Sequence, residues 1–264
     1  MFAEDKKTMI VSIITPTYNC ENSIDSTLSS VAKQSSDRIE HIIVDNMSSD
    51  NTLGIVNKYH NKYDLKVHSE PDNGIADAFN KGIGHARGDW LYFLGAGDTI
   101  IDEFVIENMI KILQSKKEND LLVWGNVISV SSTGTEIQLA GNKPKHYLKR
   151  YNCYHHQSVF HRSLLFSKYG KFNEGFRICM DYDLMLRIYE SILPINYVNI
   201  DIAKFMEDGV SSENYLTTLK EFREAQIKNK VRPKYLPFIF YIYSSLKYFV
   251  RIGLRQLQFS QNIY

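Results

Sequence analysis

A few carboxylates, glycines and a lysine at short spacings are the residues of this sequence best suited to chemistry. Asp77 and Lys81 are four residues apart, so on a helix they share one face and suit a phosphate-bearing ligand. Residues 95–98, Gly-Ala-Gly-Asp, follow an apolar run, where an open sheet presents ligand-binding groups. Asp181 and Asp183 open an apolar-periodic segment, where one of them is placed to act as a general base. Together these groups predict a sugar-nucleotide site.

Each carboxylate also has a structural explanation. Asp45 follows an apolar run, so it either accepts hydrogen bonds from a base such as uracil or makes an N-cap or Asx turn. Asp98 either binds a divalent cation that bridges diphosphate oxygens or caps the helix starting near residue 101. Asp181 and Asp183 point about 200° apart on a helix, so only one faces a site, and either can simply cap it. The glycines before Asp98 favour the metal, and Asp181 is favoured as the base.

The histidines and cysteines argue against a zinc centre or a disulfide framework. His155 and His156 are adjacent, so on an extended segment at most one of them lines a cleft. A loop histidine with its own hydrogen bonds is favoured over a metal ligand or an acceptor contact. Cys20, Cys153 and Cys179 are odd in number and lack Cys-x-x-Cys spacing, which fits a reducing compartment.

The elements that must position these groups alternate along the first half of the chain. Val- and Ile-rich runs typical of buried strands are separated by helical patterns, which predicts an α/β fold with a parallel, doubly wound sheet. The expected strands are 9–15, 39–45, 65–68, 90–94 and 121–125, and the expected helices are 21–33, 51–63, 80–87 and 103–115. Beyond Gly125 the pattern is less regular, with a hairpin at 127–139 and a helix at 181–191.

Charge divides the 264 residues into two unequal parts. Residues 228–264 hold seven Lys and Arg and no Asp or Glu, so the net charge of +1 divides into +7 for this tail and −6 for the residues before it. The overall charge gives no argument for a nucleic-acid partner. Lys247, Arg251 and Arg255 recur every four residues beside an apolar stripe, which predicts a basic amphipathic helix on an anionic membrane surface. The alternative is that the stripe packs on the domain or on a second copy in a homo-oligomer.

With these residues assembled, the sequence resembles the inverting glycosyltransferase family 2, of the GT-A fold, over residues 11–212. The resemblance implies a Rossmann-like, doubly wound mixed sheet. Each motif is weak alone, but their order is specific. The motifs are Thr15-Pro-Thr-Tyr-Asn19, Ile42-Ile-Val-Asp45 with Ser48-Ser-Asp-Asn-Thr52, Asp72-Asn-Gly-Ile-Ala-Asp-Ala-Phe-Asn-Lys-Gly82, Phe93-Leu-Gly-Ala-Gly-Asp98, Met180-Asp-Tyr-Asp-Leu-Met-Leu-Arg187 and Asp208-Gly-Val-Ser-Ser212.

The resemblance also implies roles. It implies that Pro16, Thr17, Tyr18 and Asp45 hold the nucleoside, that Asp77 and Lys81 lie near the base or diphosphate, that Asp98 binds Mn²⁺ or Mg²⁺, and that Asp181 is the base. Ala96 and Gly97 stand where the usual Asp-any-Asp metal motif has another carboxylate, so either the metal is held more weakly or His156 assists in binding it. The division is then a GT-A domain at 1–227, with a nucleotide half at 9–125 and an acceptor half at 126–227, and a tail at 228–264.

The expected activity follows from the same resemblance. The chain lacks the Gln-x-x-Arg-Trp signature of processive synthases, so it is expected to transfer one sugar from a nucleotide sugar, UDP by family frequency, and release the product. The expected acceptor is a lipid-diphosphate-linked saccharide of O-antigen or another bacterial surface polysaccharide. Because the first residues are too polar for a signal peptide, a cytoplasmic protein on the inner face of the membrane is expected. The alternatives are a nucleotidyltransferase and a catalytically weak scaffold protein that binds sugar nucleotides.

Overall fold

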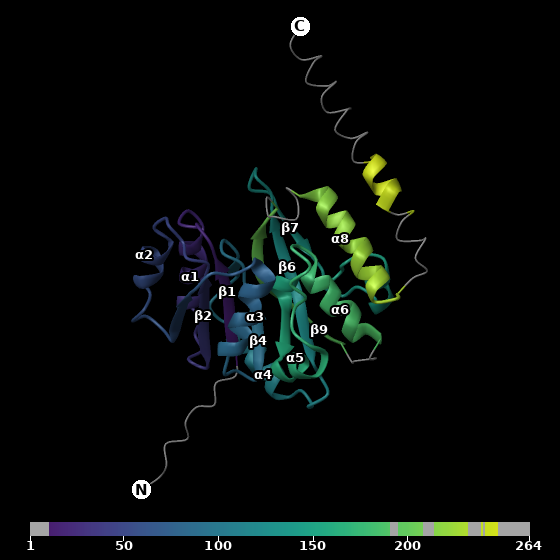
Figure 1. Cartoon of the computed structure of the whole chain (residues 1–264). Coiled ribbons are helices and arrows are strands. Elements are labelled where there is room, and N and C mark those ends of the chain that lie inside the picture. The colour runs from purple at the N-terminus through teal and green to yellow at the C-terminus, as the bar shows by residue number, and fades with distance from the viewer. Residues whose placement is uncertain (1–10, 191–194, 208–213, 232–238, 240, 248–264) are drawn as a thin grey trace.

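One mixed sheet with helices on both faces forms the centre of the molecule (Figure 1). The computed structural model describes residues 11–190, 195–207, 214–231, 239 and 241–247. The strand order is β3-β2-β1-β4-β8-β6-β9-β5, with β7 paired to β6. This arrangement confirms the predicted α/β class.

The first half of the sheet consists of four parallel strands, as the alternating pattern predicts. They are β1 (Val11–Thr17), β2 (Ile39–Asp45), β3 (Leu65–Ser69) and β4 (Trp90–Phe93), joined through α1 (Ile24–Ala32), α2 (Thr52–Asn57) and α3 (Ile75–His85). The side chains of β1 and β2 are nearly all buried, because helices cover both faces of the sheet there. The helix predicted at 80–87 begins five residues earlier, at Ile75, and the one predicted at 51–63 ends at Asn57.

The second half departs from a parallel sheet. Its elements are β5 (Thr99–Ile100), α4 (Val105–Gln114), β6 (Leu122–Val130), β7 (Glu136–Leu139), η1 (Lys145–Lys149), η2 (His156–Ser158), β8 (Val159–Arg162), α5 (Ser163–Tyr169), α6 (Met180–Glu190), β9 (Ile195–Met206) and α8 (Tyr215–Lys228). Strand β8 runs antiparallel to both β4 and β6, which makes the sheet mixed. The predicted hairpin is confirmed as β6 and β7, whereas β8, β9 and α8 have no counterpart in the expected elements.

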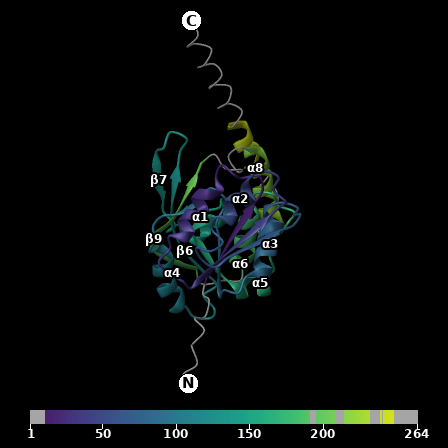
Figure 2. The same ribbon diagram turned by 90° about the vertical axis from the view of Figure 1, so that its left-hand side faces the viewer.

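Neighbouring residues of each strand enter different cores, because strand side chains alternate between faces. Ile14 and Phe93 pack with residues of α3, α5 and α6, and Ile13 and Tyr92 pack with residues of α4. Helices α1 and α2 enclose Ile43 on the second face. Figure 2 shows the two helical layers on either side of the sheet.

Contacts with α6 include residues 229 and 231, and the predicted division at residue 228 stays a prediction. Asn229 donates a hydrogen bond to Asp183, and Val231 is buried in the core beside α6. Residues 239 and 241–247 are helical, whereas the remaining tail and the predicted motif at 208–212 lie outside the described residues. Within the described part of the chain, no helix has the length and apolar character needed to cross a bilayer.

His41 in β2 predicts a loss of stability in acid. Its ring is fully buried, with Nε2 2.9 Å from Thr15 Oγ1 and Nδ1 2.9 Å from the Tyr63 hydroxyl, and burial lowers its pKa from 6.5 to about 3. Below pH 6.5, His41 therefore binds a proton in the unfolded chain but stays neutral in the folded protein. The stability present above pH 6.5 is lost as the pH falls toward 3, and we expect His41 to account for about 2 kcal/mol between pH 7 and pH 5.

Urea denaturation at pH 7 and pH 5 tests this expectation. The His41→Gln variant, whatever its stability at pH 7, should lose about 2 kcal/mol less than the parent over this interval. His60 is exposed, so His60→Gln is the matched control and should keep the parent's pH dependence. Equal losses for His41→Gln and the parent would contradict the assignment.

Candidate active site

The parallel strands end at one edge of the sheet, and the first group of predicted site residues lies there. Thr17 pairs in register with Asp45, and Asp45 pairs with Ser69, so the ends of β1, β2 and β3 are neighbours. The backbone N–H of Asn46 donates to the Thr17 carbonyl at 2.9 Å. Residues 95–98 follow β4, which adjoins β1 on its other side. Ligands of open α/β sheets bind at this carboxyl edge.

Asp45 is buried at this edge with hydrogen bonds to both oxygens. Oδ1 accepts from the hydroxyls of Thr17 (2.9 Å) and Ser48 (2.5 Å), and Oδ2 accepts from the Ser48 N–H (2.9 Å) and the Ser69 hydroxyl (2.8 Å). Four donors fill the usual acceptor capacity of a carboxylate. A nucleobase can therefore donate to Asp45 when the hydroxyl of Ser48 or Ser69 turns away, and nucleoside binding by Asp45 stays a prediction.

Exposed apolar side chains lie on the turns beside Asp45. Tyr18, which follows β1, is 62% exposed, and Met47, which follows β2, is 59% exposed. Pro16 is half-buried within β1, in register with Val44. The sequence analysis named Pro16 and Tyr18 but not Met47. An apolar side chain within the polar turn at residues 46–50 was the feature that could have drawn attention to it.

Asp77 and Lys81 share one face of α3, as predicted. Their Oδ2 and Nζ atoms are 3.4 Å apart. Asp77 also accepts from the backbone N–H of Asn73 at 2.9 Å, and Lys81 donates to the carbonyl of Pro71. The pair therefore holds the loop that leads into α3, and its contact with a nucleotide stays a prediction.

Asp98 lies in a tight turn that its own side chain closes. Its Oδ2 accepts from the Gly95 N–H at 3.2 Å, and the buried Thr27 hydroxyl of α1 donates to the Asp98 carbonyl at 2.8 Å. Gly97 has φ +104°, and a Cβ on Gly95 would meet the Asp98 carboxylate at 2.8 Å. Both glycines are therefore required by the turn itself. The sequence analysis missed Thr27, which fixes this turn from a helix about 70 residues away.

His156 connects Asp98 to the start of α6. The buried Tyr92 hydroxyl donates to the Gln157 carbonyl at 2.7 Å, which fixes η2 over the sheet. Burial raises the pKa of Asp98, and this effect is opposed by the charge of His156 and the side-chain amide of Gln157. His156 Nδ1 is also 4.0 Å from Asp181 Oδ2. One imidazole therefore acts on both predicted functional carboxylates.

Asp181 opens α6 and keeps 19% of its side chain exposed. Asn152, which the sequence analysis missed, donates to its Oδ2 at 2.8 Å, and the Tyr182 N–H donates to its Oδ1 at 2.7 Å. Burial raises the pKa of Asp181 above its usual 3.8. A raised pKa makes a carboxylate a better proton acceptor, and this one is still reachable from solvent.

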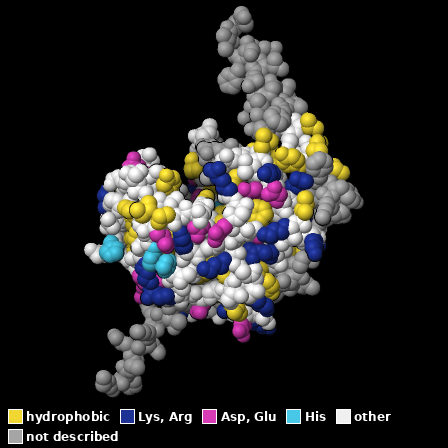
Figure 3. Space-filling model, in the orientation of Figure 1, with side chains coloured by type: hydrophobic (Ala, Val, Ile, Leu, Met, Phe, Trp, Pro, Cys, Tyr) yellow, Lys and Arg dark blue, Asp and Glu magenta, His cyan; other side chains and the backbone are white. Residues whose placement is uncertain are grey.

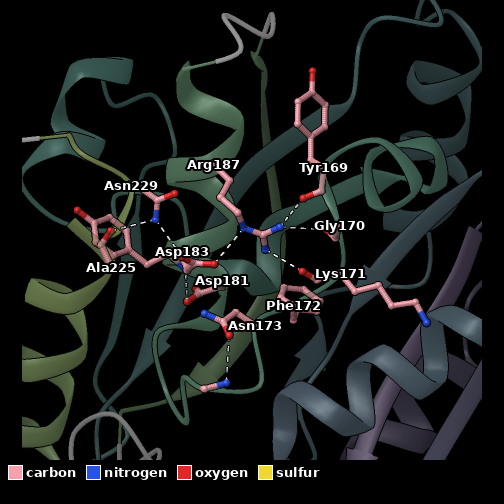
Figure 4. A network of polar contacts seen from close by, with 12 residues as sticks. Tyr169, Gly170, Lys171, Phe172, Asn173, Asp181, Asp183, Arg187, Ala225 and Asn229 are labelled. Carbon is pink, nitrogen blue, oxygen red and sulfur yellow. Dashed lines mark hydrogen bonds and ion pairs between the residues drawn. The ribbon is translucent and has the colours of Figure 1, made fainter. Parts of the chain in front are cut away.

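Asp183 has a different position, shown in Figure 4. Its carboxylate is fully buried, with Oδ2 3.0 Å from Arg187 Nε and Oδ1 accepting from Asn229 Nδ2 at 2.9 Å. Arg187 also donates to three consecutive backbone carbonyls at the end of α5, those of Tyr169, Gly170 and Lys171. Asp183 is thus held in a buried structural network, and of the two acids Asp181 is the one that keeps part of its side chain exposed.

The residues near Asp98 fit a cation that is completed by a ligand. Among the residues that the structure describes, no three His, Cys, Asp or Glu side chains are grouped as a metal site. Asp98 and His156 offer one carboxylate and one imidazole, and burial, which raises the pKa of Asp98, makes a cation beside this carboxylate favourable. Mg²⁺ is commonly held by one or two carboxylates plus substrate phosphates. A diphosphate would supply those remaining ligands.

Comparisons with known proteins identify the family of this chain. Residues 12–176 match the family described as Glycosyl transferase family 2. The PGL/p-HBAD biosynthesis glycosyltransferase of Mycobacterium bovis is 32% identical over 214 residues, which cover 80% of this chain and 81% of that protein. An uncharacterized glycosyltransferase of Mycobacterium tuberculosis is 30% identical over 207 residues, which cover 76% of this chain and 77% of that protein.

Solved structures show the same fold at lower identity. S. aureus TarS in complex with UDP-GlcNAc superimposes with a TM-score of 0.66 at 20% identity, covering 82% of this chain and 66% of that one. A mannosyltransferase from Pyrobaculum calidifontis in complex with GDP-Man and Mn²⁺ superimposes with a TM-score of 0.65 at 18% identity. The match covers 85% of this chain and 65% of that one. This chain thus spans about two thirds of the length of each solved chain. From the family match, the identities and the shared fold, the protein belongs to glycosyl transferase family 2 and has a GT-A-type fold.

Proposed function

We propose that this protein is an inverting, non-processive hexosyltransferase. It moves one sugar from a nucleotide sugar, most simply a UDP-sugar, to a lipid-diphosphate-linked saccharide of O-antigen or a related bacterial surface polysaccharide. One observation carries the proposal. Asp181, a partly exposed carboxylate with a raised pKa, lies 4.0 Å from His156, and the charge of the same imidazole acts to lower the pKa of Asp98.

The proposed reaction divides the work between these two carboxylates. Asp181 takes the proton from an acceptor hydroxyl, and that oxygen attacks the anomeric carbon from the side opposite the leaving group. The bond from the anomeric carbon to the diphosphate oxygen breaks, and the nucleoside diphosphate departs with the electron pair. Asp98 and His156 would hold Mn²⁺ or Mg²⁺, which when bound neutralises charge on the diphosphate. The raised pKa of Asp181 supports its role as the proton acceptor.

A peripheral position on the inner face of the cell membrane is part of the proposal. Ile239, Ile242, Tyr243 and Leu246 are exposed at spacings that place them on one face of a helix, and Lys247 follows. Figure 3 shows apolar side chains gathered over this segment and basic side chains spread across the same side of the molecule. An apolar face beside basic groups suits an anionic bilayer, where each basic group contributes about 1 kcal/mol.

Product analysis tests the proposed activity. We expect the full-length protein with Mn²⁺ to release nucleoside diphosphate from one class in a panel of UDP-, GDP- and dTDP-sugars. Release should accelerate with a lipid-linked saccharide, and NMR of the product should show an inverted anomeric centre. Binding without turnover would favour the scaffold alternative, and release of pyrophosphate would favour a nucleotidyltransferase.

Liposomes added to the same assay test the membrane position. The protein should sediment with phosphatidylglycerol vesicles, and less so as salt rises, because exposed charges are screened. Substituting both Tyr243 and Leu246 by Glu should abolish sedimentation. Ile137 on the hairpin is similarly exposed, so Ile137→Glu is the matched control and should sediment like the parent. Unchanged sedimentation of the double variant would contradict the membrane surface without affecting the assigned activity.

A further inference from the structure

Helix α8 lies beside the first turn of α6, although no sequence pattern linked the two. Cys179, Tyr182 and residues of α8 belong to one core. The Tyr182 and Phe222 rings are 4.5 Å apart, and Gln226 Nε2 donates to the Tyr182 hydroxyl at 3.0 Å. Tyr182 immediately follows Asp181, so α8 contacts the backbone segment that carries the proposed base.

Glu221 of α8 makes polar contacts with the segment that leads into α6. It is 7% exposed, and its carboxylate accepts three backbone hydrogen bonds, from Arg177 (3.0 Å), Ile178 (2.8 Å) and Cys179 (2.8 Å). The Cys179 carbonyl in turn accepts from the Asp183 N–H at 2.9 Å, the first hydrogen bond of α6. Glu221 therefore binds the N–H groups of the chain as it enters this helix.

Two physical properties make this contact suited to positioning. Hydrogen bonds to an ionised acceptor are about twice as strong as neutral ones, and a helix N-terminus favours negative charge. Because one buried side chain accepts three such hydrogen bonds, the backbone at residues 177–179 has little freedom to shift. Asp181 is two residues further on, and a displacement of about 1 Å at a reacting group can cost about 100-fold in rate.

We infer that Glu221 is a positioning residue that holds Asp181 in its reactive place through the N-terminus of α6. The inference rests on the proposed role of Asp181 as the base. Glu221 acts through the backbone of residues 177–179. Its loss should therefore slow the chemical step while leaving the carboxyl edge of the parallel strands intact.

The Glu221→Gln variant tests this role, because an amide has one acceptor oxygen where the carboxylate has two. We expect kcat for sugar transfer to fall about 10- to 100-fold. KM for the donor and the calorimetric affinity for UDP should stay at the parent's values. Glu224, on the same helix, is 45% exposed and paired with Lys220, so Glu224→Gln is the matched control and should leave kcat unchanged.

Two further measurements keep the outcomes distinct. All rates are taken well below the melting temperature of each variant and normalised to the folded fraction, so that lost stability is not counted as lost rate. A parental kcat for Glu221→Gln, with Asp181→Asn inactive, would overturn the positioning role alone. An active Asp181→Asn would instead overturn the proposed base, whatever Glu221→Gln does. Equal losses in kcat and UDP affinity would show a general structural role and would also overturn the inference.

Discussion

Asp181→Asn should lower kcat for sugar transfer by about 10³-fold while leaving UDP affinity nearly unchanged. The amide keeps the size of the carboxylate and its contact with Asn152 can be retained by the side-chain oxygen, but it cannot take the proton of the acceptor hydroxyl. Nucleotide binding should survive because the residues proposed to hold UDP lie in or beside β1, β2 and α3, whereas Asp181 lies on α6. Steady-state transfer kinetics and calorimetric titration with UDP measure the two quantities separately.

Asp183→Asn is the informative comparison for this experiment. Asp183 is fully buried against Arg187 and Asn229, so loss of its charge leaves Arg187 without its counter-ion and should cost about 3 kcal/mol or more in stability. Its folded fraction should nevertheless retain the general base. If Asp183→Asn is folded and inactive while Asp181→Asn transfers sugar at the parental rate, the base has been assigned to the wrong carboxylate.

Asp98→Ala should abolish the effect of Mn²⁺ on UDP binding. In the parent we expect Mn²⁺ and UDP to favour each other's binding by about 1–3 kcal/mol, a typical coupling between two sites. The half-buried Asp98 carboxylate supplies the negative charge that a cation beside a diphosphate requires. UDP titrations of parent and variant, each with and without Mn²⁺, give this coupling free energy directly.

Asp98→Asn separates charge from shape in this measurement. The amide oxygen can still accept from the Gly95 N–H, so the turn should persist, yet the coupling should disappear with the charge. Melting curves of both variants show whether the turn has been preserved. A coupling of the same size in the parent and both variants would rule out a metal role for Asp98.

The sequence by itself determined the features that depend on neighbours along the chain. The strands β1 to β4 and the helices between them follow from apolar runs and helical periodicity. Both patterns can be recognised within a short segment of sequence. The pairing of Asp77 with Lys81 follows from helical geometry alone, since residues four apart share a face. The family motifs could be identified from the sequence because each is a short continuous stretch.

Tertiary structure decided which of these groups are available and what holds them. Ser69, 24 residues away, donates one of the four hydrogen bonds to Asp45, and Asn229, 46 residues away, donates to the buried Asp183. The antiparallel β8, which makes the sheet mixed, follows the short helix of His156, which Tyr92 of β4 fixes over the sheet. Glu221 meets the start of α6 across more than 40 residues. Such partners depend on how the chain closes long loops around a common core, and local periodicity carries no information about that closure.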